Sequence, residues 1–241
     1  MEFNPIDLLY FAIVFPVVII VSIFIKRTIR HKKYLVVVLI LSVLLFYVRI
    51  ILVLFQEWIG IMPYINDDIL FYVLLTVFGA GFSVYYVLKI EGKVFKEIGF
   101  EITDLKKTLI YTALSFLPLI ALFPLIIILA EIQLATAIVW EKIVLGVTFG
   151  LILGGFYEEV MFRGVIQNYL MDMTDHKKAI LFTALIFTAT HIGYLPFIGF
   201  GIFYIFLFVM ALLLSVLRYK FNQLACFILH GGIVFILVIA V

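Results

Sequence analysis

The chain has 241 residues, of which 66% are hydrophobic and only 13% are charged, and its mean hydropathy is +1.30. Soluble proteins carry roughly a quarter charged residues, so this composition excludes a soluble domain and predicts an all-α, polytopic membrane protein. The net charge of +2 is too small to indicate a nucleic-acid partner, and a single cysteine, Cys226, excludes an internal disulfide or a cysteine-rich metal site.

Apolar runs near the roughly 20 residues that cross a bilayer recur along the whole chain. We expect a bundle of about eight transmembrane helices, at residues 6–25, 34–55, 69–88, 108–130, 143–165, 179–198, 200–217 and 224–241. The first run is followed, not preceded, by basic residues, which is the reverse of a cleaved signal, so we expect it to be retained. No polar connection is long enough to fold alone, and residues 1–241 are therefore predicted to form a single integral-membrane domain.

Basic residues alternate between successive connections. The connections after the first, third, fifth and seventh predicted helices are rich in Lys and Arg, whereas the intervening ones hold at most one. The rule that cytoplasmic loops are positive then predicts a multi-pass protein of the cell membrane with both termini outside. Residues 89–100, in the third connection, mix apolar and charged side chains, which fits either an amphipathic segment at the cytoplasmic interface or a solvated linker.

The most informative stretch is residues 154–164, with the sequence GGFYEEVMFRG. Gly146, Gly150, Gly154 and Glu158 recur every four residues, so they share one face of a helix. Small residues in such a row allow a neighbouring helix to approach closely. Glu158 is therefore expected to point into the helix bundle.

The two adjacent carboxylates of this stretch differ in their local partners. Arg163 lies four residues after Glu159, the spacing at which a guanidinium and a carboxylate meet on one helix, whereas Glu158 has no such partner. Ionisable groups at membrane depth are costly enough that function is the default interpretation. Glu158 is thus a candidate general base or acid; the alternative is a structural ion-pair cluster that locks two helices.

Two histidines fall inside predicted helices, His191 in the sixth and His230 in the eighth, and Phe187 precedes His191 by one turn. At 1.5 Å per residue, Glu158 and His230 lie roughly 10 Å from the cytoplasmic helix ends and His191 roughly 18 Å. All three therefore fit one cavity in the cytoplasmic half of the bundle. Two histidines with a glutamate pair at such depth indicate a functional site.

Several hydrolase signatures are absent from the sequence. It has no His-Glu-x-x-His or His-x-x-Glu-His zinc motif, no Gly-x-Ser-x-Gly elbow and no intramembrane aspartate pair. A glutamate and a histidine can instead polarise a water for attack on a carbonyl carbon, while a second histidine donates to the oxyanion. Peptide-bond hydrolysis inside the membrane is the reaction we infer. Cys226, one turn before His230, is an alternative nucleophile, but a buried cysteine more often acts as a small hydrophobic residue.

Three motifs, in this order, resemble those of the type II CAAX prenyl endopeptidases and the wider family of CAAX proteases and bacteriocin-processing enzymes: Glu158-Glu159-x-x-x-Arg163, Phe187-x-x-x-His191 and a late His230. The resemblance implies a metal-independent intramembrane glutamate protease that needs no cofactor. In relatives of this kind, the last three residues are removed from a prenylated cysteine.

By the same resemblance, Glu158 is the base, His191 shares the water and His230 lines the oxyanion hole. Glu159 and Arg163 would hold the helix and the base in position. The implied partners are a lipidated or membrane-bound peptide or protein substrate and the membrane lipids, with a cavity open to both the cytoplasm and lipid.

Val234 departs from the family pattern, because members commonly carry Asn or Asp four residues after the last histidine. Valine cannot donate to an oxyanion, and losing one donor costs about 2.7–4 kcal/mol of transition-state stabilisation. The chain is then a slow protease, recruits another donor such as Asn222, or is a non-proteolytic scaffold or bacteriocin-immunity protein of the same fold. Asn222 has a helix-end cap as its alternative role. A proton-coupled transporter is disfavoured because no internal repeat is visible.

Overall fold

The computed structural model describes residues 20, 30–38, 77, 79–129, 134, 137, 139–191 and 201–240. Every regular element in this part is helical, and four stretches are long and apolar enough to cross a membrane: Leu105–Ile128, Lys142–Met173, Ile202–Lys220 and Gln223–Ala240. Within these residues the expected all-helical fold is confirmed, with four helices that have the length and composition of membrane spans. The predicted helix at 6–25 lies outside the described residues apart from residue 20, and those at 34–55 and 69–88 are described only in part, so the count of eight stays a prediction.

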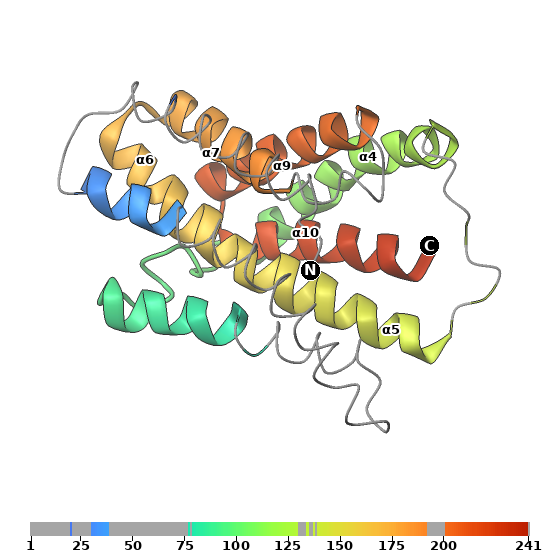
Figure 1. Cartoon of the computed structure of the whole chain (residues 1–241), viewed down its shortest axis with the longest axis horizontal. Coiled ribbons are helices and arrows are strands. Elements are labelled where there is room, and N and C mark those ends of the chain that lie inside the picture. Colours follow the sequence, from blue (N-terminus) through green and yellow to red (C-terminus); the bar gives the residue numbers. More distant parts are fainter. Residues whose placement is uncertain are drawn as a thin grey trace, which may run out of the picture.

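One long helix crosses the middle of the molecule. It consists of α5 (Trp140–Gly146), the π-helical segments η2 (Val147–Glu158) and η3 (Val160–Ile166), and α6 (Gln167–Met173), and the residues at each junction keep helical dihedrals (Figure 1). It continues to residue 173, beyond the predicted end at 165. Wide π-helical turns inside a longer helix often mark functional sites, and here η2 ends at Glu158 while Glu159 lies between η2 and η3.

Helix α10 (Gln223–Ala240) lies alongside this central helix (Figure 1). Their contact depends on glycines from both partners: a Cβ atom added to Gly150 would stand 2.7 Å from the carbonyl oxygen of Gly231, and one added to Gly231 would stand 3.0 Å from that of Gly150. A Cβ on Gly146 would meet the ring of Phe235 at 2.9 Å. The predicted glycine face is confirmed, because any larger residue there would push the two backbones apart.

Helices α7 (His176–Thr190) and α9 (Ile202–Lys220) pack on each other, and α9 also contacts α10 and α4 (Leu105–Leu129). Asp175 caps α7 by accepting a hydrogen bond of 3.0 Å from the backbone amide of Lys178. That amide and the ammonium group of the same lysine hold the pKa of Asp175 below its usual range. The last residue of α7 is Thr190, whereas the predicted helix reached residue 198; residues 192–200 lie outside the described part.

The connection between η1 (Tyr86–Ile90) and α4 packs against the bundle. Ile98 is buried, and a Cβ on Gly164 would lie 3.2 Å from its Cδ1 atom. The carbonyl oxygen of Gly99 accepts a hydrogen bond of 2.8 Å from the backbone amide of Gln223. Ile98 and Gly99 therefore attach this connection to the central helix and to the start of α10, which argues against a fully solvated linker. An amphipathic segment at the cytoplasmic interface stays a prediction.

Candidate functional site

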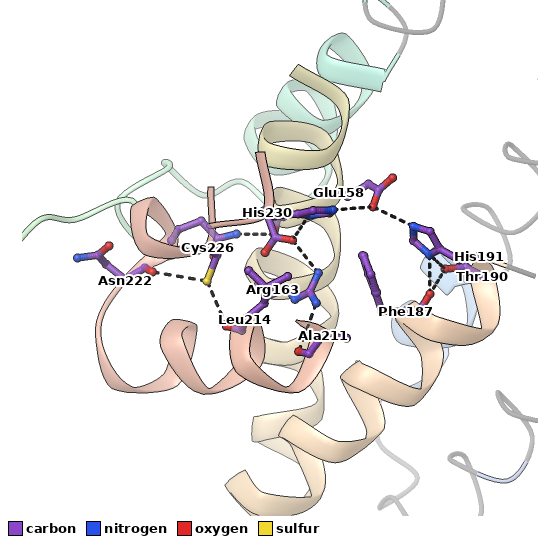
Figure 2. A network of polar contacts seen from close by, with 12 residues as sticks. Glu158, Arg163, Phe187, Thr190, His191, Ala211, Leu214, Asn222, Cys226 and His230 are labelled. Atoms are coloured by element: carbon purple, nitrogen blue, oxygen red, sulfur yellow. Dashed lines mark hydrogen bonds and ion pairs between the residues drawn. The ribbon is translucent and has the colours of Figure 1, made fainter. Parts of the chain in front are cut away.

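Three elements that are distant in sequence bring Glu158, His191 and His230 together. Glu158 ends η2, His191 directly follows α7, and His230 lies within α10 (Figure 2). The Oε2 atom of Glu158 lies 3.4 Å from Nε2 of His191 and 3.9 Å from Nε2 of His230. Among the described residues, no guanidinium lies within ion-pair distance of Glu158. Glu158, which has no arginine at helical spacing in the sequence, is thus the carboxylate that faces both imidazoles.

Glu159 is completely buried. Its Oε1 atom accepts a hydrogen bond of 2.7 Å from Nη1 of Arg163, which confirms the predicted ion pair. The same oxygen lies 2.7 Å from Nδ1 of His230. The side chain of Glu158 keeps 17% of its surface exposed, whereas that of Glu159 keeps none, so only Glu158 can be reached from outside the core.

The hydrogen-bond partner at Nδ1 of each histidine determines whether the Nε2 atom on the other side of the ring can accept a hydrogen bond. His191 Nδ1 lies 2.7 Å from the carbonyl oxygen of Phe187, which can only accept, so Nδ1 carries the proton. In the neutral ring, Nε2 of His191 then bears a lone pair that faces Glu158. His230 has a carboxylate at Nδ1, which makes that nitrogen a donor as well. A water that lies beside both atoms can donate one hydrogen to Glu158 and the other to Nε2 of His191, because the 3.4 Å between the two acceptors leaves no space for a water directly between them.

Phe187 packs in the middle of these polar groups, as Figure 2 shows. Its ring centroid is 4.2 Å from Cζ of Arg163, 4.3 Å from the ring of His191 and 5.5 Å from the ring of His230. An arginine over an aromatic face gains a cation–π attraction. Phe187 therefore lies against both histidines and separates the Glu159–Arg163 pair from His191.

Asn222 lies away from the three residues that converge at Glu158 (Figure 2). Its Oδ1 atom accepts a hydrogen bond of 3.1 Å from the amide of Ala225, three residues on, and its Nδ2 atom donates to Oγ1 of Thr108 on α4 at 2.7 Å. This is the geometry of a helix N-cap. Of the two roles considered for Asn222, the structure favours the cap over an oxyanion donor, because both polar atoms of its side chain are engaged.

Cys226 is buried and turned toward α9. Its Sγ atom donates to the carbonyl oxygen of Leu214 at 3.1 Å (Figure 2). A thiol held by a helix carbonyl in an apolar interior behaves as a packing residue rather than as a nucleophile.

Several supporting contacts were not predicted from the sequence. The side-chain amide of Gln223 donates to the backbone oxygen of Glu159, Gln167 donates to the backbone oxygen of Ser215, and the hydroxyl of Tyr204 donates to the backbone oxygen of His191. The sequence does indicate a buried role for Gln167, because this residue continues the four-residue spacing from Glu159 through Arg163. The other two contacts join distant positions and leave no local pattern.

A metal centre was considered on the basis of the donor set. Within the described ranges, no group of three or more His, Cys, Asp or Glu side chains is arranged to hold a metal ion. The described acid and base groups instead contact one another or backbone carbonyls.

Comparison with protein families identifies the segment that carries these residues. Residues 139–236 match the family model described as type II CAAX prenyl endopeptidase Rce1-like. The matched segment begins just before α5, ends within α10, and includes Glu158, His191 and His230. No curated protein and no solved structure matches the chain.

Proposed function

We propose that this chain, whose residues 139–236 match the family model described as type II CAAX prenyl endopeptidase Rce1-like, is an integral-membrane endopeptidase. Its substrate would be a lipidated CAAX-type protein, or another membrane-associated protein, cleaved near the C-terminus. The observation that carries the proposal is the approach of Glu158 Oε2 to 3.4 Å from His191 Nε2 and 3.9 Å from His230 Nε2.

The first step is activation of a water by Glu158 and His191. Because Nδ1 of His191 donates to a carbonyl, its Nε2 atom can accept one hydrogen of the water while the carboxylate of Glu158 accepts the other. As the water oxygen forms a bond to the scissile carbonyl carbon, its proton passes to Glu158. Each group then has a single role: the carboxylate takes the proton and the imidazole orients the attack.

The second step is stabilisation and collapse of the tetrahedral intermediate. His230 has Glu159 at Nδ1, and an Nε2–H on the opposite side of its ring would donate to the oxyanion. When the carbon–nitrogen bond breaks, Glu158 returns its proton to the leaving amine. The products are a new C-terminal carboxylate and a short peptide with a free amino group.

The membrane arrangement that we propose has eight spans, both termini outside, and a site that opens toward the cytoplasm and lipid. It is supported by the alternation of basic connections along the sequence and by the four apolar helices of the described part. A lipid-modified C-terminus needs such access, because its prenyl group stays in the bilayer while the peptide enters from the aqueous side.

Purified protein in proteoliposomes provides the test. A farnesylated peptide ending in a CAAX sequence is incubated with the protein, and the products are identified by mass spectrometry. Release of the last three residues, at a rate that EDTA does not change, is the expected result. Failure to release any peptide from several prenylated sequences would argue against an endopeptidase.

Val234 favours a second candidate, a non-proteolytic membrane scaffold or bacteriocin-immunity protein of the same fold. The position one turn after His230 lacks the side-chain donor that the resemblance leads one to expect. For such a protein, wild type and Glu158→Gln would behave identically in the peptide assay, while both could still protect cells or bind a partner.

A further inference from the structure

Tyr204 connects the start of α9 to the histidine that faces Glu158. Its hydroxyl group donates a hydrogen bond of 2.9 Å to the main-chain oxygen of His191. The two residues are thirteen positions apart, and the hydroxyl is partly buried. Tyr204 contacts the main chain of a residue in the proposed site without belonging to the sequence motifs.

His191 has a particular need for such a contact because it lies outside the regular helix. α7 ends at Thr190, and His191 has φ −92° and ψ 8°. The carbonyl groups in the last turn of a helix have no intrahelical partner, and an unsatisfied carbonyl at membrane depth is costly. The Tyr204 hydroxyl donates to the carbonyl group of His191, at the end of α7.

His191 and the last turn of α7 have contacts on two sides. The ring of His191 donates to the carbonyl oxygen of Phe187, and its backbone amide donates to the carbonyl oxygen of Thr188 at 3.2 Å. Phe187 in turn packs on the central helix, where its ring lies 5.0 Å from that of Phe162 and 4.2 Å from Cζ of Arg163. The hydrogen bond from Tyr204 adds a contact from α9 to the main chain of His191.

Helix α9 connects His191 to the central helix, because hydrogen bonds join α9 to that helix. Arg163 Nη2 donates to the backbone oxygen of Ala211 at 3.4 Å, and Gln167 Nε2 donates to that of Ser215 at 2.8 Å. Both acceptors lie on α9, one turn apart. A hydrogen bond from Tyr204 therefore relates His191 to the helix that bears the glutamate.

We propose that Tyr204 is a positioning residue, which holds His191 at its 3.4 Å separation from Glu158. The proposal rests on the proposed function. A misplacement of about 1 Å at a reacting group can cost on the order of a hundredfold in rate, so loss of this one hydroxyl should lower the rate of the chemical step while leaving substrate binding unchanged.

The test compares Tyr204→Phe with Tyr219→Phe in the full-length protein, since both remove one phenolic hydroxyl from α9 and Tyr219 lies at its opposite end. Tyr204→Phe should lower kcat by about tenfold or more with KM within about twofold, and Tyr219→Phe should change neither. In a His191→Ala background, Tyr204→Phe should cause no further loss. A wild-type kcat for Tyr204→Phe, or an equal loss in the His191→Ala background, would overturn the proposal.

A second measurement does not depend on proteolysis. Diethyl pyrocarbonate modifies accessible imidazoles, and the modified peptides can be quantified by mass spectrometry. In Tyr204→Phe the modification rate of His191 should rise relative to that of His230, and in Tyr219→Phe the ratio should stay at its wild-type value. If the wild type cleaves nothing, the proposed function fails while this ratio still decides the role of Tyr204; an unchanged ratio in Tyr204→Phe would contradict that role.

Discussion

Glu159 Oε1 lies 2.7 Å from His230 Nδ1 and also 2.7 Å from Arg163 Nη1, so one buried oxygen joins the arginine to the histidine. The sequence spacing predicted only the contact with Arg163. The second contact places Glu159 behind His230, on the side of the ring opposite the nitrogen that approaches Glu158. The two adjacent glutamates therefore face the same imidazole, Glu159 at Nδ1 and Glu158 at Nε2.

Replacing Glu159 by Gln tests this arrangement. The amide keeps the shape of the side chain but removes the charge that faces Nδ1 of His230, and we expect kcat to fall by at least about a hundredfold with a small change in KM. Steady-state kinetics on a prenylated peptide would measure both. Glu101→Gln, at a half-exposed carboxylate paired with Lys96, is the control and should retain wild-type kinetics. Equal activity of the two variants would show that the contact with His230 has no catalytic consequence.

Arg163 should contribute mainly to stability. Its guanidinium is fully buried, binds Glu159 and lies over the ring of Phe187. Arg163→Ala leaves an uncompensated carboxylate in the core, which typically costs about 3–5 kcal/mol, so the thermal unfolding midpoint in detergent should fall by several degrees. Lys107→Ala removes an exposed ion pair with Asp104 and should have little effect. Similar midpoints for the two variants would contradict a structural role for the buried pair.

Gly154 borders the nitrogen that we assign to the oxyanion. A Cβ atom there would lie 3.3 Å from His230 Nε2 and 3.2 Å from the carbonyl oxygen of Phe149, whereas a Cβ on Gly164 would meet Ile98, with its Cδ1 atom nearest at 3.2 Å. Gly154→Ala should therefore lower kcat by about tenfold or more, since blocking one oxyanion donor costs on the order of 10²–10³-fold. Gly164→Ala serves as the matched control and should stay near wild type. Full activity of Gly154→Ala would mean that the oxyanion binds elsewhere.

The parts of the site that sequence could predict are those with local spacing. The glycine face and the Glu159–Arg163 pair both follow from four-residue periodicity, and the structure confirms both. The contact between Glu159 and His230 spans 71 residues, and Tyr204 contacts His191 through tertiary packing, so no local sequence pattern predicts either contact.

The helix ends were predicted less well than the helices. Hydrophobicity alone extended the sixth predicted helix to residue 198, but α7 ends at Thr190. The central helix was predicted to end at 165 and continues to Met173, because polar residues such as Gln167 find partners on α9 instead of ending the helix. Apolar composition marks what can lie in a membrane, and it does not mark where the helical hydrogen bonds stop.

Val234 provides a gain-of-function prediction. It is half-buried, one turn after His230 on α10, at the position where the resemblance to CAAX proteases leads us to expect Asn or Asp. Val234→Asn should raise kcat by about tenfold or more, since one added oxyanion donor can contribute up to 10²–10³-fold. Val234→Leu, which adds no donor, should not raise it. An Asn variant no faster than wild type would show that a donor from this position does not reach the oxyanion.

The most direct test of the central claim is the rate at which Glu158→Gln releases the C-terminal tripeptide from a prenylated peptide, measured beside wild type and beside Glu101→Gln. The neutral amide cannot take a proton from water, so release should fall by at least about a thousandfold, while Glu101→Gln remains active and all three proteins unfold at similar temperatures. Release by Glu158→Gln at a rate within tenfold of wild type would contradict the assignment of Glu158 as the base.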